Sequence, residues 1–125
     1  MSGRFPTLNY WCVVSVDLHE IARLLTPVFN FNLCEFDAED LYEWFETADS
    51  LGRAWNVSRK HRGGESAFDD RLRIVISPVP EDEDKVGRVL AETLKSPVIF
   101  GEVTYIKGDD YAYREQKRFE GGDKL

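Results

Sequence analysis

The 125-residue sequence predicts a single α+β domain, in which a mixed or mainly antiparallel sheet of about five to six strands is packed with three helices. The length suits one domain, and 42% hydrophobic with 13% aromatic residues is enough apolar material for one core. Segments that alternate with period two are interspersed with segments at helical spacing. We therefore expect one domain over residues 1–125, with residues 118–125 as a frayed tail.

The N-terminal third predicts a strand, a helix and a short second strand. Residues 9–16 are rich in aromatic and β-branched residues, which is typical of a buried strand. Asp17 can cap the next helix, and Glu20 at its third position completes a capping box. Pro27 is expected to end that helix, and alternation of apolar side chains with asparagine suggests a short strand over residues 29–33.

The segment between Asp37 and Gly52 predicts a second, acidic helix. Asp37 is the expected N-cap, and Gly52 follows the expected last turn. An apolar stripe at helical spacing consists of Leu41, Trp44, Phe45 and Ala48. The opposite face would carry Glu39, Glu43, Glu46 and Asp49.

The remaining sequence predicts four strands and a third helix. The strands are expected at residues 54–60, 71–77, 98–106 and 111–116. The helix begins in the acidic run 80–84 and ends before Pro97. Residues 62–70, which contain two adjacent glycines, are expected to be a flexible connector.

The charge of the chain narrows the kind of partner that it can have. A formal net charge of −7 argues against nucleic acid or an anionic membrane, because both are polyanions. It is compatible with a basic protein partner. No apolar run reaches the length of a membrane span, and the N-terminus lacks the pattern of a signal peptide, so we expect a cytoplasmic protein.

The expected acidic helix is the first candidate for a binding surface. No Lys or Arg occurs between Arg23 and Arg53, whereas seven acidic residues do. Like charges four residues apart on a helix repel, and a basic partner would relieve that repulsion. An ordinary solvated helix face is the alternative. The predicted partner-binding residues are Glu39, Glu43, Glu46 and Asp49.

Two further groups are candidates for contacts with a ligand or a partner. Arg59, Lys60 and Arg62 form a basic run that could bind an anion, or could instead balance the acidic segment or protect an edge strand. Tyr111 and Tyr113, if they share a strand face, could anchor a protein interface, with packing in the core as the alternative.

The sequence lacks a recognisable catalytic or metal-binding pattern. Cys12 and Cys34 lie among apolar neighbours and are expected to be reduced core thiols. They do not form short-spaced ligand pairs with His19 or His61, so we expect no metal and no cofactor. No serine lies in a nucleophile elbow, so no catalytic residue is nominated.

In size, charge and expected compartment, the chain resembles the small acidic immunity proteins with which bacteria neutralise the toxins of neighbouring cells. That resemblance implies a cytosolic, non-catalytic protein that binds a basic toxin domain, often of nuclease type, through clustered carboxylates. It assigns no role to an individual residue. A small enzyme that binds a phosphate-bearing or acidic substrate through Arg59–Arg62, and a regulatory or structural subunit of a cellular complex, are the alternatives.

Overall fold

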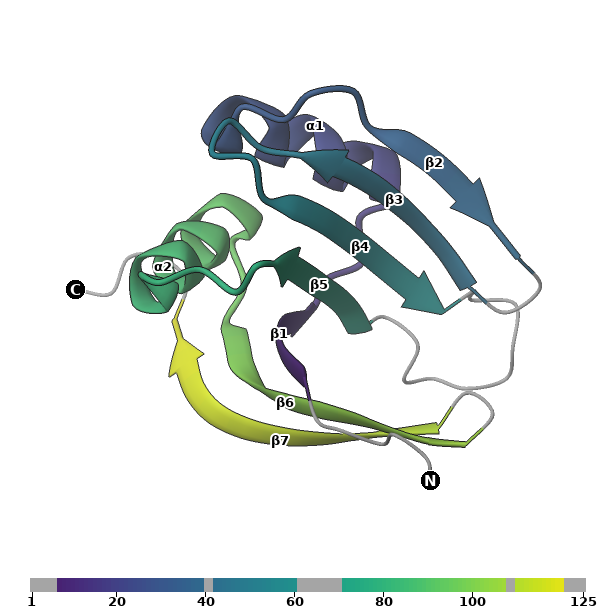
Figure 1. Cartoon of the computed structure of the whole chain (residues 1–125), viewed down its shortest axis with the longest axis vertical. Helices are drawn as coiled ribbons and strands as arrows, with labels where there is room; N and C mark the ends of the chain where they lie inside the picture. The colour runs from purple at the N-terminus through teal and green to yellow at the C-terminus, as the bar shows by residue number, and fades with distance from the viewer. Residues whose placement is uncertain (1–6, 40–41, 61–70, 108–109, 121–125) are drawn as a thin grey trace.

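The computed structural model describes residues 7–39, 42–60, 71–107 and 110–120, which form one curved antiparallel sheet and two helices (Figure 1). The strand order is β2-β3-β4-β5-β1-β6-β7, and every neighbouring pair is antiparallel. The strands are β1 (Thr7–Val13), β2 (Glu35–Ala38), β3 (Tyr42–Ala48), β4 (Ala54–Lys60), β5 (Arg71–Ser77), β6 (Val98–Lys107) and β7 (Asp110–Phe119). The helices are α1 (Leu18–Phe29) and α2 (Glu83–Leu94).

The α+β class is therefore confirmed, but the number of elements differs from the expectation. The described residues form seven strands rather than five to six, and two helices rather than three. The bounds of β4 and β5 are those predicted; β5 alternates between buried and more exposed positions along its whole length, whereas β4 alternates as far as Val57, after which Ser58 and Arg59 are also buried.

The core lies between the two helices and one face of the sheet. A single row of residues in register crosses that face and consists of Phe36, Phe45, Val57, Ile74, Tyr10 and Phe100. All of these except Phe36 belong to the hydrophobic core, together with Ile21 and Leu25 of α1 and Leu90 and Ala91 of α2. Both helices therefore cover the same face, and neither of these described helices covers the opposite face of the sheet.

Helix α1 begins as the sequence predicts and ends later. The Asp17 side chain accepts a hydrogen bond from the backbone N–H of Glu20 at 2.9 Å, so the predicted cap is confirmed. Pro27 lies inside the helix, which continues to Phe29 and ends at Asn30 in the left-handed conformation. The strand expected over residues 29–33 is therefore wrong. Proline removes only one intrahelical hydrogen bond near the end of this helix, and the last turn still forms.

The predicted acidic helix between Asp37 and Gly52 is wrong, since this segment forms the antiparallel pair β2 and β3. Phe45 is fully buried against the helices, and the next residue, Glu46, is exposed, which is the two-residue period of a strand. Aromatic and β-branched residues in β3 favour a strand, and pairing with β4 places Phe45 opposite Val57. Tertiary pairing thus outweighs the helical spacing of the apolar residues.

The C-terminal hairpin is curved, and it extends beyond its predicted end. Strands β6 and β7 bend together along one side of the sheet (Figure 1), with a register shift between Phe100 and Gly101. A Cβ atom at position 101 would collide with the carbonyl oxygen of Arg114, so the shift requires glycine. Strand β7 includes positions 118 and 119, and Phe119 is buried beside Gly87. These two residues are therefore not part of a frayed tail, and residues 121–125 lie outside the described ranges.

Candidate functional site

The face of the sheet opposite the helices, called the open face below, carries polar and aromatic side chains. A row of residues in register runs across it and consists of Trp44, Ser58, Arg73, Trp11 and Ile99. Trp11 is only 5% exposed although it is on the face that the two described helices do not cover; Tyr113 of β7 contacts its ring edge-on, and Arg71 of β5 lies over Tyr113. The open face is thus partly covered by its own side chains, and two of the pockets formed by described residues lie on it.

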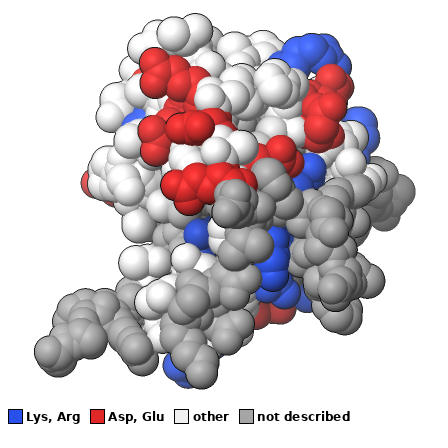
Figure 2. Space-filling view, turned by 90° about the vertical axis from the view of Figure 1, so that its right-hand side faces the viewer, with Lys and Arg blue, Asp and Glu red and all other residues white. Residues whose placement is uncertain are grey.

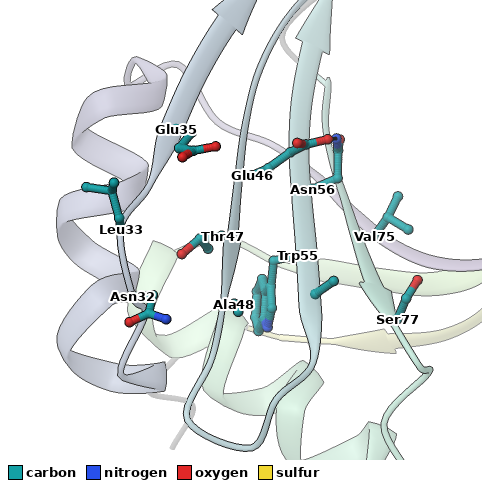
Figure 3. Close-up of a pocket in the computed structure, with 11 residues that line it drawn as sticks. Asn32, Leu33, Glu35, Glu46, Thr47, Ala48, Trp55, Asn56, Val75 and Ser77 are labelled. Carbon is teal, nitrogen blue, oxygen red and sulfur yellow. Dashed lines mark hydrogen bonds between the residues drawn. The ribbon is translucent and has the colours of Figure 1, made fainter.

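The first pocket, called the acidic pocket below, lies where β2, β3, β4 and β5 are adjacent (Figure 3). Its volume is about 600 Å³. One row of residues in register across the four strands supplies Glu35, Glu46, Asn56 and Val75. The remaining lining residues are Asn32, Leu33, Thr47, Ala48, Ala54, Trp55 and Ser77.

The electrostatics of the acidic pocket favour a cation. Glu35 and Glu46 are directly opposite on neighbouring strands, an arrangement of like charges that destabilises a sheet. Asn56 donates a hydrogen bond from Nδ2 to Oε2 of Glu46 at 3.2 Å, and no Lys or Arg is among the described lining residues. A cationic group with several N–H donors would match these acceptors.

The acidic pocket belongs to a wider acidic region. All four residues of β2 are exposed, and among the described strands β2 is at the edge of the sheet and pairs only with β3. Figure 2 shows several Asp and Glu side chains in the upper half of the face it views, with Lys and Arg side chains at the upper right and below them. Edge strands of this kind pair readily with other chains unless charge or bulges prevent it.

The predicted acidic row does not lie along one helix face, because it is divided between the two faces of the hairpin. Glu46 lines the acidic pocket, whereas Glu43 is three residues away and opposite Arg59 on the helix-covered face. Glu39 is exposed just beyond the end of β2. Glu35 is not among the site residues predicted from the sequence, because only the strand register shows that it is opposite Glu46.

Asp49, which was expected on the binding surface, is used inside the fold. It is 6% exposed, and it accepts hydrogen bonds from Trp55 Nε1 at 2.9 Å and from Arg53 Nε at 2.8 Å. The backbone N–H groups of Leu51 and Arg53 donate to its other oxygen. Burial raises the pKa of Asp49, but the bonds from Trp55 and Arg53 outweigh it and hold the pKa below its ordinary value. This carboxylate therefore fixes the turn between β3 and β4.

The residues of the predicted basic run, Arg59, Lys60 and Arg62, do not form one site in the described part of the chain. Arg59 is 4% exposed, and its guanidinium donates to the carbonyl oxygens of Val14 and Val16 at 2.9 and 2.8 Å. It thereby holds the connection between β1 and α1. Lys60 is half-buried at the end of β4, and Arg62 lies outside the described residues.

Two other arginines, both on β5, occupy the open face together with the predicted tyrosines. The Cζ atom of Arg71 is 3.9 Å from the ring centroid of Tyr113, and that of Arg73 is 4.4 Å from the ring centroid of Tyr111. Tyr113 also contacts Trp11 edge-on, with ring centroids 4.9 Å apart. Tyr111 and Tyr113 therefore share one face, which was the condition for their proposed role at an interface, and both are half-buried.

The cysteines and histidines that the structure describes form no reactive centre. Cys12 is buried, and burial raises its pKa to about 12, whereas Cys34 is only partly buried. His19 stacks on the ring of Phe36 with centroids 3.9 Å apart, and His61 is outside the described ranges. Over those ranges, no cluster of His, Cys, Asp and Glu side chains could hold a metal ion. Neither described helix has the length and apolar character needed to cross a bilayer.

Comparisons of the chain with protein-family models, with curated proteins and with solved structures found no match.

Proposed function

We propose that this chain is a non-catalytic protein-binding module that uses the acidic pocket and the β2–β3 hairpin to bind a basic partner. More specifically, we propose a cytosolic immunity protein that neutralises a basic bacterial toxin domain of nuclease type by direct binding. The single observation that carries the proposal is the opposed pair Glu35 and Glu46, which flanks a pocket with no described cationic lining residue.

The geometry of the pocket supports a Lys or Arg side chain of the partner as the group that enters it. Two carboxylates on adjacent strands can accept hydrogen bonds from both sides of a guanidinium or ammonium group. Glu46 is already oriented by Asn56, so less side-chain freedom is lost when the partner binds. Leu33, which is 74% exposed at the rim, can cover the aliphatic stem of the same side chain.

The charge of the whole chain supports a basic protein as the partner. A net charge of −7 raises the association rate with a basic domain and disfavours nucleic acid as a competing ligand. Basic active sites are typical of proteins that bind a polyanion, so an acidic protein that covers such a surface blocks access of nucleic acid.

The test is co-expression and titration with a basic toxin domain encoded next to this chain. We expect a stable complex and loss of nuclease activity at equimolar chain. The double variant Glu35→Gln/Glu46→Gln should bind about tenfold more weakly or worse, because a partner cation in the pocket loses both of its charged acceptors.

The matched control is Glu81→Gln/Glu92→Gln, which removes the same charge from two exposed positions outside the pocket. It should inhibit as wild type does. The proposal is contradicted if the toxin stays active with excess chain, or if the pocket variant and the control inhibit equally.

A further inference from the structure

The open face has a second pocket, called the basic pocket below, which adjoins the acidic pocket. Its volume is about 570 Å³, within the usual range for small-molecule sites. Val75 and Ser77 line both pockets and lie on the side of the acidic pocket away from Leu33 (Figure 3). The other lining residues are Thr7, Leu8, Asn9, Arg73, Ile76, Val79, Val103, Tyr105 and Tyr111.

Arg73 gives this pocket a positive charge that no described carboxylate neutralises. Its guanidinium is held over the Tyr111 ring, and its Nε atom is buried without a hydrogen-bond partner among the residues described. In a chain with 23 acidic and 16 basic residues, an arginine left without an ion pair on a concave face is a candidate for an anion.

Asn9 supplies a second unsatisfied group in the same pocket. It is 3% exposed, and its Nδ2 atom donates to the Thr7 hydroxyl at 3.1 Å, which in turn donates to the Val103 carbonyl at 3.3 Å. The Asn9 Oδ1 atom is buried and accepts no hydrogen bond from the described part of the chain. A buried acceptor of this kind costs about 1–3 kcal/mol when it is left unpaired, so a ligand that donates to it is favoured.

The two groups lie on the same face of the sheet. Arg73 is opposite Trp11 in the pairing of β5 with β1, and Asn9 is two residues before Trp11 on β1. A ligand in the basic pocket therefore faces both the N–H donors of the Arg73 guanidinium and the acceptor oxygen of Asn9. It must combine an oxyanion with an O–H or N–H donor near it.

The walls of the pocket favour a small organic molecule over a nucleic acid strand. Val79, Val103 and Tyr105 provide apolar and aromatic surface, which suits an apolar ligand body. Arg73 already covers the Tyr111 ring, so this ring is not free to stack on a base. The net charge of −7 also opposes a polyanion more strongly than a molecule with one anionic group.

We propose that the basic pocket binds a small organic acid whose oxyanion pairs with the Arg73 guanidinium and whose neighbouring hydroxyl or amino group donates to Asn9 Oδ1. The apolar body of the acid lies against Val79, Val103 and Tyr105. This site is separate from the acidic pocket, and the variant Glu35→Gln/Glu46→Gln leaves all of its residues in place.

The experiment is a titration of the full chain, followed by backbone amide NMR shifts, with three probes that share a phenyl group. These are 3-phenyllactate, 3-phenylpropionate and phenyl phosphate. The first two differ only in the hydroxyl beside the carboxylate, and the third replaces the carboxylate by a phosphate. We expect 3-phenyllactate to shift amides of β1, β5 and β6 around the pocket and to bind about tenfold more tightly than 3-phenylpropionate. Phenyl phosphate could bind more tightly than the two carboxylates. That result would also support the site, and it would mean that Arg73 prefers a phosphate to a carboxylate.

Variants assign the two contacts. Arg73→Gln should weaken 3-phenyllactate binding by about tenfold or more, since a charged hydrogen bond is lost, and Arg73→Lys should bind with intermediate affinity. Asn9→Ala should remove the difference between 3-phenyllactate and 3-phenylpropionate. The control Arg88→Gln removes the same charge from an exposed position on α2 and should bind as wild type.

The proposal is overturned if no probe shifts amides around the pocket, if Arg73→Gln binds as tightly as Arg88→Gln, or if the hydroxyl makes no difference to the wild type. Arg73→Lys retains the charge over the Tyr111 ring, so it tests the site even if Arg73→Gln fails to fold.

Discussion

Replacement of Asp49 by Asn tests whether this carboxylate supports the fold. The change keeps the shape of the side chain but replaces one acceptor oxygen by an N–H₂ group, which faces donors from Arg53 and Trp55. Breaking a buried, charged and fully hydrogen-bonded group of this kind costs about 3 kcal/mol. We expect that loss in the free energy of unfolding near neutral pH, measured by urea denaturation with tryptophan fluorescence.

The same variant should also change how stability depends on pH. The pKa of Asp49 in the folded chain lies below its ordinary value of 3.8, so its ionised form stabilises the fold above that pH. This contribution is lost as the pH falls from 3.8 toward the pKa of the folded state. The loss in the free energy of unfolding caused by Asp49→Asn should therefore be largest near neutral pH and smaller near pH 3 (about one unit below the ordinary pKa). Two results would refute the stabilising role of Asp49. One is a free energy of unfolding within about 0.5 kcal/mol of wild type near neutral pH, and the other is an equal loss at both pH values.

Two further predictions concern the sheet and the thiols. Gly101→Ala places a methyl group against the Arg114 carbonyl at the β6–β7 register shift. It should lower the free energy of unfolding, measured in thermal melts, by about 2 kcal/mol. An unchanged melting temperature would be evidence against this close approach. Cys12 is buried with a pKa raised by burial to about 12, whereas Cys34 is partly exposed, so Cys34 should react much faster with a thiol reagent in the native state; equal rates for the two thiols would contradict their placement.

The strands β4 and β5 and the N-cap of α1 could be predicted from local sequence. Large apolar side chains recur at every second position, at Trp55 and Val57 and at Leu72, Ile74 and Ile76, and this spacing depends only on the pleat of a strand. The Asp17 cap and Glu20 likewise depend on contacts within four residues of the chain. Such features need no knowledge of the neighbouring elements.

The β2–β3 hairpin could not be predicted in this way. Trp44 and Phe45 are compatible with a helical stripe, but in the sheet they lie on opposite faces, with Phe45 in the core and Trp44 on the open face. The choice between a helix and a strand depends on pairing with β4. The spacing of apolar residues within the segment itself does not specify that pairing.

The residues of the two pockets come together only through strand register. Glu35 and Glu46 are eleven positions apart in sequence and directly opposite in the sheet, and Asn9 and Arg73 are on neighbouring strands from distant parts of the chain. The sequence shows the excess of acids and the basic run, but it does not show that Arg59 and Asp49 are used inside the fold. Burial separates these structural charges from the charges that remain accessible.

If the acidic pocket attracts and holds a basic protein partner, its carboxylates should set the association rate with that partner. Wild type, Glu35→Gln/Glu46→Gln and Glu81→Gln/Glu92→Gln are compared at low salt and at about 0.15 M salt, where the Debye length is about 8 Å. The two double variants have the same net charge, so any difference between them reports the position of the carboxylates. We expect the pocket variant to associate more slowly than the control at low salt, and we expect its association rate to depend less on the salt concentration. Equal association rates for the two double variants at low salt would contradict this expectation.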